Sequence, residues 1–171
     1  MASLIEELVS TLSSEIEVYE KMVPISEKKT RIIVKNDLEG LVSITEQEQL
    51  AVERLQVLEH KREEIVRNIA VVLSKDVKTL TLKNMIALFH NQPEVQKELS
   101  RIHDTLQSLL KRIVENNERN RMLIEQSLEM IEFNRNVLQS TFLTPGSNNY
   151  TSKASQFDMP LGQMGTFDAK Q

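Results

Sequence analysis

Histidine, carboxylate, cysteine and glycine residues build most catalytic and metal sites, and here none of them forms a pattern that performs such chemistry. The three histidines are His60, His90 and His103, and none has a second histidine three or four residues away, so the helical zinc pattern is absent. His103 and Asp104 are sequence neighbours, which do not face each other on a helix. There is no cysteine and no glycine-rich phosphate loop. We therefore predict no enzymatic activity, no metal and no cofactor.

The charged residues, 27% of the chain, are arranged as on solvent-exposed helix surfaces. Opposite charges alternate, as in EHKREE at 59–64. The net charge of −4, without clusters of Lys and Arg between aromatic residues, argues against nucleic acid or an anionic membrane as a partner. The N-terminal stretch is acidic where a signal peptide is basic, and no apolar run approaches the ~20 residues of a membrane span. We expect a cytoplasmic protein without membrane insertion.

The elements that must carry any function are helices, because the 171 residues include only four glycines and four prolines. The apolar spacing predicts an all-α fold, an elongated antiparallel helical bundle or set of helical hairpins. Three long helices and one short helix are expected, at 3–35, 37–73, 93–142 and 81–90. Residues 1–144 would form the bundle, and 145–171 a flexible, disordered tail.

Two features of the first two helices leave choices open. Pro24 either kinks or breaks the first helix, because it removes a backbone hydrogen bond. Either Asn36 or Asp37 caps the second helix. A heptad count from Leu38 predicts a partly polar seam along the second helix, in which four of eleven positions are not apolar. The eleven seam positions are Leu38, Leu41, Thr45, Glu48, Val52, Leu55, Glu59, Arg62, Val66, Ile69 and Leu73.

The last helix carries two apolar stripes. On a wheel of 100° per residue, one stripe falls within about 60° of Ile124 and is predicted to face the core. It contains Leu99, Ile102, Leu106, Leu109, Leu110, Ile113, Ile124, Leu128, Ile131 and Leu138, and it is interrupted by Asn117 and Asn120. A second stripe begins after Asn120, with Leu123, Met130 and Val137 at seven-residue steps, widened by Met122 and Phe133.

A helix this apolar needs two neighbours, and two explanations remain open. The second stripe could pack between other helices of the same bundle. Alternatively, it could receive an amphipathic helix from another protein, a use to which methionine-containing surfaces are suited. The asparagines would then mark the boundary between the part of the helix that holds the bundle and the part that holds a partner.

The segment after Thr144 contains scattered large side chains in a polar context. It includes Tyr150 and a repeated Phe-Asp pair at 157–158 and 167–168. These residues are either short docking elements or incidental apolar residues of a solvated tail, and the role of the Phe-Asp pair stays open.

The order of these features resembles the FlgN family of flagellar export chaperones. A first helix of about 35 residues is followed by EQEQLAVERLQVLEHKREEI at 46–65, then a short helix, then NRMLIEQSLEMIEFNRNVL at 120–138. A polar tail with a tyrosine, here Tyr150, comes next. The resemblance covers the chain up to Tyr150, and the Phe-Asp pairs have no counterpart in it.

The resemblance implies a cytoplasmic chaperone of type III flagellar export. Such a protein binds the C-terminal helices of the hook–filament junction proteins FlgK and FlgL, prevents their premature assembly and delivers them to the export gate. Because client contact in the family concentrates near the C-terminus, the expected contacts are Asn120, Leu123, Met130, Phe133 and Val137. Tyr150 matches by order the tyrosine associated with docking at the gate protein FlhA.

The alternative hypothesis is that the protein is a structural coiled-coil scaffold or a homo-oligomeric assembly protein, in which the second stripe is buried against an identical copy. The free chaperone is expected to be a monomer or a loose homodimer. The sequence leaves open which client is preferred, the oligomeric state of the free protein and the order of helices in the bundle.

Overall fold

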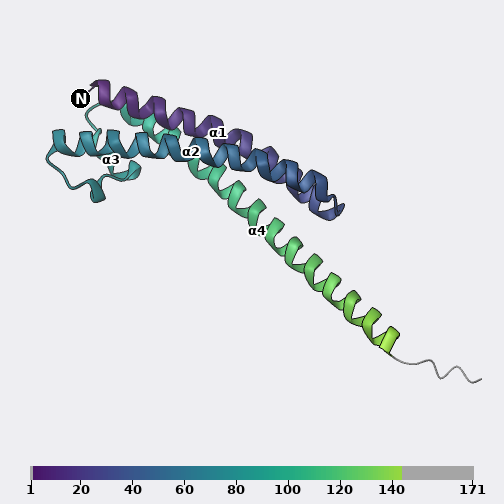
Figure 1. Cartoon of the computed structure of the whole chain (residues 1–171). Coiled ribbons are helices and arrows are strands. Elements are labelled where there is room, and N and C mark those ends of the chain that lie inside the picture. The colour runs from purple at the N-terminus through teal and green to yellow at the C-terminus, as the bar shows by residue number, and fades with distance from the viewer. Residues whose placement is uncertain (1, 144–171) are drawn as a thin grey trace, which may run out of the picture. The chain divides into compact units, whose positions relative to one another are not determined.

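The ordered elements of the protein, in a computed structural model that describes residues 2–143, are all helical (Figure 1). They are α1 (Ala2–Val34), α2 (Leu38–Leu73), the 3-10 turn η1 (Val77–Thr79), α3 (Leu82–Leu88) and α4 (Pro93–Leu143). The predicted all-α class is confirmed, with three long helices and one short one. The predicted tail, with Tyr150 and the Phe-Asp pairs, lies outside the described residues.

A tight turn joins α1 to α2 because two adjacent residues have suitable backbone chemistry. Asn36 adopts the left-handed conformation with φ 53°, which asparagine tolerates better than most residues. Its backbone N–H donates to the Ile33 carbonyl at 3.0 Å and so satisfies the end of α1. Asp37 then caps α2, its carboxylate accepting from the Gly40 N–H at 2.8 Å. Of the two predicted caps, Asp37 is therefore the one used.

Helices α1 and α2 lie side by side and antiparallel (Figure 1). Two ion pairs show the register, Glu15 with Arg62 at 2.9 Å and Lys29 with Glu48 at 2.5 Å. The partners are 14 residues apart on each helix, from 15 to 29 and from 48 to 62, which is two heptads. Two of the polar positions expected on the α2 seam are therefore paired with opposite charges on α1. Pro24 lies inside α1, which continues through it, so of the two alternatives left open the break does not occur.

The predicted α2 seam is correct at seven of its eleven positions. The residues that are buried or half-buried along α2 are Leu41, Ile44, Glu48, Ala51, Leu55, Leu58, Arg62, Ile65, Val66, Ile69, Ala70 and Leu73, with Gly40 in the first turn. Four predicted seam positions, Leu38, Thr45, Val52 and Glu59, are exposed. The count from Leu38 predicted Thr45, Val52 and Glu59, whereas the preceding residues Ile44, Ala51 and Leu58 are the ones that face α1 or the core. A seam whose steps are three then four residues shares every second position with a seam whose steps are four then three, so the remaining positions were still correct.

The core joins all the helices near the N-terminal end of α1. Its buried members are Ile5, Leu8, Leu12, Ile16, Ile65, Ile69, Ala70, Leu80, Met85, Phe89, Leu99, Ile102 and Leu106. Thr81 caps α3 by accepting from the Asn84 N–H at 3.2 Å. Because η1 and α3 bring the chain back to the start of the hairpin, α4 runs parallel to α1, as the contacts of Glu27 with Arg112 and Thr30 with Asn120 show.

Gly40 is expected to behave unlike an ordinary helix glycine. Replacing a helix glycine by alanine usually stabilises by about 0.5–1 kcal/mol. Here the new Cβ would lie 2.4 Å from Asp37 Oδ2, so Gly40→Ala must displace the cap and lose about 1 kcal/mol. We expect no net gain from Gly40→Ala in the native chain, measured by urea unfolding.

The double-mutant cycle isolates this clash. In an Asp37→Ala background the obstacle is gone, and Gly40→Ala is expected to stabilise by about 0.5–1 kcal/mol. An equal effect of Gly40→Ala in both backgrounds would show that the cap and the glycine are independent.

Candidate functional site: a docking surface on helix α4

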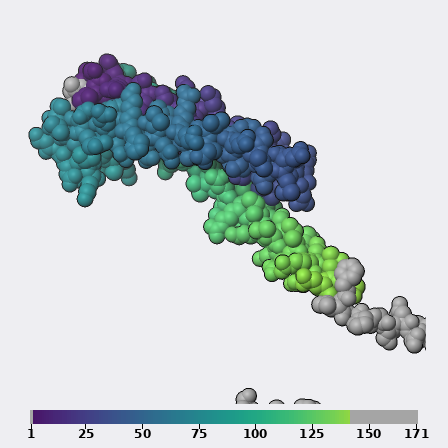
Figure 2. Space-filling model, in the orientation of Figure 1, coloured from purple at the N-terminus to yellow at the C-terminus, as the bar shows by residue number. Residues whose placement is uncertain are grey.

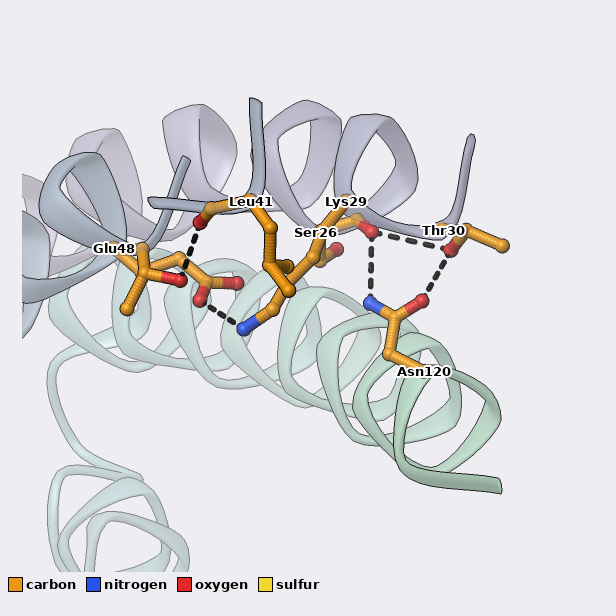
Figure 3. A network of polar contacts seen from close by, with 7 residues as sticks. Ser26, Lys29, Thr30, Leu41, Glu48 and Asn120 are labelled. Atoms are coloured by element: carbon orange, nitrogen blue, oxygen red, sulfur yellow. Dashed lines mark hydrogen bonds and ion pairs between the residues drawn. The ribbon is translucent and has the colours of Figure 1, made fainter. Parts of the chain in front are cut away.

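A buried polar network holds α4 to α1 at Asn120, which is 3% exposed (Figure 3). Asn120 Nδ2 donates to the Ser26 carbonyl at 3.0 Å, and the Thr30 hydroxyl donates to Asn120 Oδ1 at 2.6 Å. One turn earlier, Asn116 Nδ2 donates to Ser26 Oγ at 2.9 Å. Buried amides with matched partners favour a single register between helices, which accounts for asparagine at this point of the seam.

Asn120 is also where the buried part of α4 ends. Between Arg121 and Thr141 no side chain of α4 is buried, and from Leu128 to Thr141 every one is exposed. The prediction that Asn117 lies in the core stripe is wrong, because this residue is exposed and its neighbour Asn116 makes the contact to α1. The predicted change in the character of α4 near Asn120 is present, but it separates a buried part from an exposed one.

The predicted core stripe is therefore correct only for the first part of α4. Leu99, Ile102, Leu106 and Ile113 are buried, and Leu110 is 41% exposed. Leu128, Ile131 and Leu138, predicted to face the core, are instead 60%, 64% and 57% exposed.

The length of α1 explains this difference. Thr30 lies beside Asn120, and α1 ends four residues later, at Val34. The α1–α2 turn then lies beside α4 between Ile124 and Ile131. Leu128 and Ile131 therefore face the turn at the end of the α1–α2 hairpin, which leaves them 60% and 64% exposed.

Four of the five predicted client contacts are apolar side chains that are at least partly exposed, and the fifth, Asn120, is buried. Leu123 is half-buried, while Met130 and Phe133 are 67% and 66% exposed. Val137, further along the helix, is 44% exposed. Asn120 differs from these four because its amide is engaged inside the bundle, so it holds α4 in place and offers no free polar atom to a partner.

The exposed residues of both stripes lie on one segment of α4, here called the exposed α4 surface and defined by Met122, Leu128, Met130, Ile131 and Phe133. Their exposed fractions range from 47% to 67%. In Figure 2 the green surface of α4 is not covered by α1 or α2 on the face shown. Single exposed apolar side chains are common, but several large ones on one helix segment mark an interaction surface. Such a helix can pair with an amphipathic helix of a partner.

A cavity of about 520 Å³ lies between the N-terminal half of α1 and the rest of the bundle. Its walls include Leu8, Met85 and Leu106, and its polar edge is the Glu15–Arg62 ion pair with Tyr19 beside it. Burial raises the pKa of the Glu15 carboxyl, although Arg62 opposes the shift. Burial also raises the pKa of the Tyr19 phenol. The ion pair completes the contact between α1 and α2, so we assign it a structural role.

The raised pKa of Glu15 predicts a specific pH dependence of stability. The folded state holds the Glu15 proton more tightly than the unfolded chain, so the contribution of this group is full below its ordinary pKa of 4.5. It declines as the pH rises from 4.5 through the raised value. Compared with Glu15→Gln, the native chain should therefore lose relative stability across that window, measured by urea unfolding at several pH values. Parallel curves for the two proteins would contradict the shift.

The residues considered for catalysis do not form a site. His103 Nδ1 lies 3.0 Å from Asp104 Oδ1, so the expectation that these neighbours do not meet is wrong; the contact is on the surface, with Asp104 79% exposed. Within residues 2–143 no group of three or more histidine, aspartate or glutamate residues could hold a metal ion. None of the helices described there combines the length and apolarity needed to cross a membrane.

These features define a class of protein, an all-helical module in which one long helix carries several exposed apolar side chains. Residues 1–156 match the family model described as FlgN protein. The chain therefore belongs to the FlgN family, a family of chaperones in flagellum biogenesis. No match was found among curated proteins or among solved structures.

Proposed function

We propose that the protein is a cytoplasmic export chaperone that binds the C-terminal helices of FlgK and FlgL, keeps them from assembling early and delivers them to the export gate. The observation that carries the proposal is the exposed α4 surface, of which Met130 and Phe133 are the most exposed members. A helix of the client would cover these side chains, with a few apolar anchors supplying most of the binding energy. Leu123 and Val137 are the further proposed contacts.

Asn120 has an indirect part in this proposal. Its hydrogen bonds to Ser26 and Thr30 keep α4 attached to α1 up to that residue. The following turns of α4 are thereby presented from a rigid base, which lowers the entropy lost on binding.

Binding is tested by mixing the purified full-length chain with C-terminal segments of FlgK and of FlgL. We expect a 1:1 complex with at least one of them, measured by light scattering after size exclusion. Absence of a complex with both segments, using protein whose helicity has been checked, would overturn the proposal. A stable dimer that keeps its mass when the segments are added would favour the homo-oligomeric scaffold.

Docking at the export gate is proposed for Tyr150 on the family resemblance. Tyr150→Ala is expected to leave the affinity for FlgK and FlgL segments unchanged and to weaken binding to FlhA, both measured by calorimetry. Equal FlhA binding by both proteins would remove Tyr150 from the site.

A further inference from the structure

A groove lies between the α1–α2 turn and α4, next to the exposed α4 surface. Its volume is about 180 Å³. Ile32 and Ile33 of α1, which are 8% and 7% exposed, are its most buried walls. The other apolar walls are Leu38 and Leu41 of α2 and Ile124, Leu128 and Ile131 of α4.

Two of the three polar side chains that line the groove, those of Asp37 and Ser127, are already engaged in hydrogen bonds within the chain. The Asp37 carboxylate accepts from the Gly40 N–H, and the Ser127 hydroxyl donates to the Leu123 carbonyl at 2.8 Å within α4. The groove therefore offers mainly apolar contact, with room for one large side chain. Such a recess beside an exposed helix is where an anchor residue of a partner gains most from burial.

A basic patch adjoins the groove. Lys28, Arg31 and Lys35 lie on one face of α1 and just beyond it, at spacings of three and four residues. They line a second hollow that shares Ile32 and Asp37 with the groove.

All three cations are exposed, and none has an ion-pair partner within the described part of the chain. Arg31 near the end of α1 suits the helix dipole, but the dipole accounts for only a few tenths to 1 kcal/mol and not for three cations in a chain of net charge −4.

We propose that the client occupies this groove with an amphipathic helix, which places one large apolar side chain between the α1–α2 turn and α4 and acidic side chains beside Lys28, Arg31 and Lys35. The inference rests on the proposed function and extends the docking surface from α4 to the α1–α2 turn. It also assigns a chemistry to the client helix, an apolar edge with an acidic flank. Opposite charges at such a rim speed association and set the orientation of the bound helix.

The test uses two variants that leave the core untouched. Leu38→Glu puts a carboxylate at the mouth of the groove, at a helix position where an acidic residue is favourable and where Leu38 is 75% exposed. Lys28→Glu with Lys35→Glu reverses the rim charge.

Dissociation constants for FlgK and FlgL segments are measured by calorimetry at low and high salt. We expect Leu38→Glu to weaken binding at least about tenfold. The lysine pair should weaken it about tenfold at low salt and less at high salt.

Matched controls carry the same changes elsewhere. Leu50→Glu alters another exposed leucine of α2, 67% exposed, and Lys83→Glu with Lys97→Glu reverses two other exposed lysines. Both controls should bind within about twofold of the native chain.

Three outcomes would be decisive against the groove or against the function. If the native chain binds and neither groove variant is weaker than its control, the groove proposal is overturned and the proposed function stands. If the native chain binds neither segment, the proposed function itself fails. If Leu38→Glu leaves client affinity unchanged but lowers the mass of the free protein in light scattering, a second copy occupies the groove, which also overturns the proposal.

Discussion

Met130→Asp combined with Phe133→Asp is expected to weaken client binding by at least about 100-fold and to leave the fold intact. Both side chains are about two-thirds exposed, at 67% and 66%, so their replacement removes little burial within the chain. Surface changes of this kind usually alter stability by less than about 0.5 kcal/mol. In the complex the new carboxylates would be buried against apolar groups without partners, which costs several kcal/mol. The affinity is measured by calorimetry and the fold by circular dichroism.

The matched control is Leu50→Asp with Val57→Asp on α2. These side chains are 67% and 69% exposed, so the control makes the same change in polarity at the same exposure. Its client affinity should equal that of the native chain. Equal losses in both double variants would mean that negative charge anywhere on the protein weakens binding, and the exposed α4 surface would lose its special role.

Asn120→Asp is expected to destabilise the protein by about 2–4 kcal/mol although it hardly changes the side-chain shape. The amide nitrogen that donates to the Ser26 carbonyl at 3.0 Å would become a carboxylate oxygen, so two acceptors would face each other in a buried place. The Thr30 hydroxyl has one hydrogen and cannot satisfy both. Urea unfolding at pH 7 measures the loss. The loss should shrink at low pH, where the introduced carboxyl is protonated and can donate.

Asn117→Asp provides the comparison, because Asn117 lies on the same helix three residues earlier and is exposed. It should change the free energy of unfolding by less than about 0.5 kcal/mol. A similar loss at both positions would mean that this part of α4 resists any added negative charge, and that the network around Asn120 has no particular importance.

The helices themselves were predictable from local information. The extents of α2 and α4, the restriction of the α2 cap to Asn36 or Asp37 and the early core positions Leu99 and Ile102 follow from side-chain spacing and from which backbone groups need a partner. The polar seam positions Glu48 and Arg62 were also correctly placed, since seven-residue spacing relates them to one another. The helix wheel located Asn120 on the stripe expected to face the core but could not show that its partners would be Ser26 and Thr30 of α1.

What the sequence determined was therefore which faces of each helix are apolar and where each helix begins and ends. What only the tertiary structure decided was which of those faces has a neighbour. Leu106 and Leu128 belong to the same stripe of α4, yet one is 9% exposed and the other 60%. The difference arises because α1 turns back after Val34, and burial depends on where the neighbouring helix ends, a distance relation between segments some 90 residues apart that no local pattern encodes.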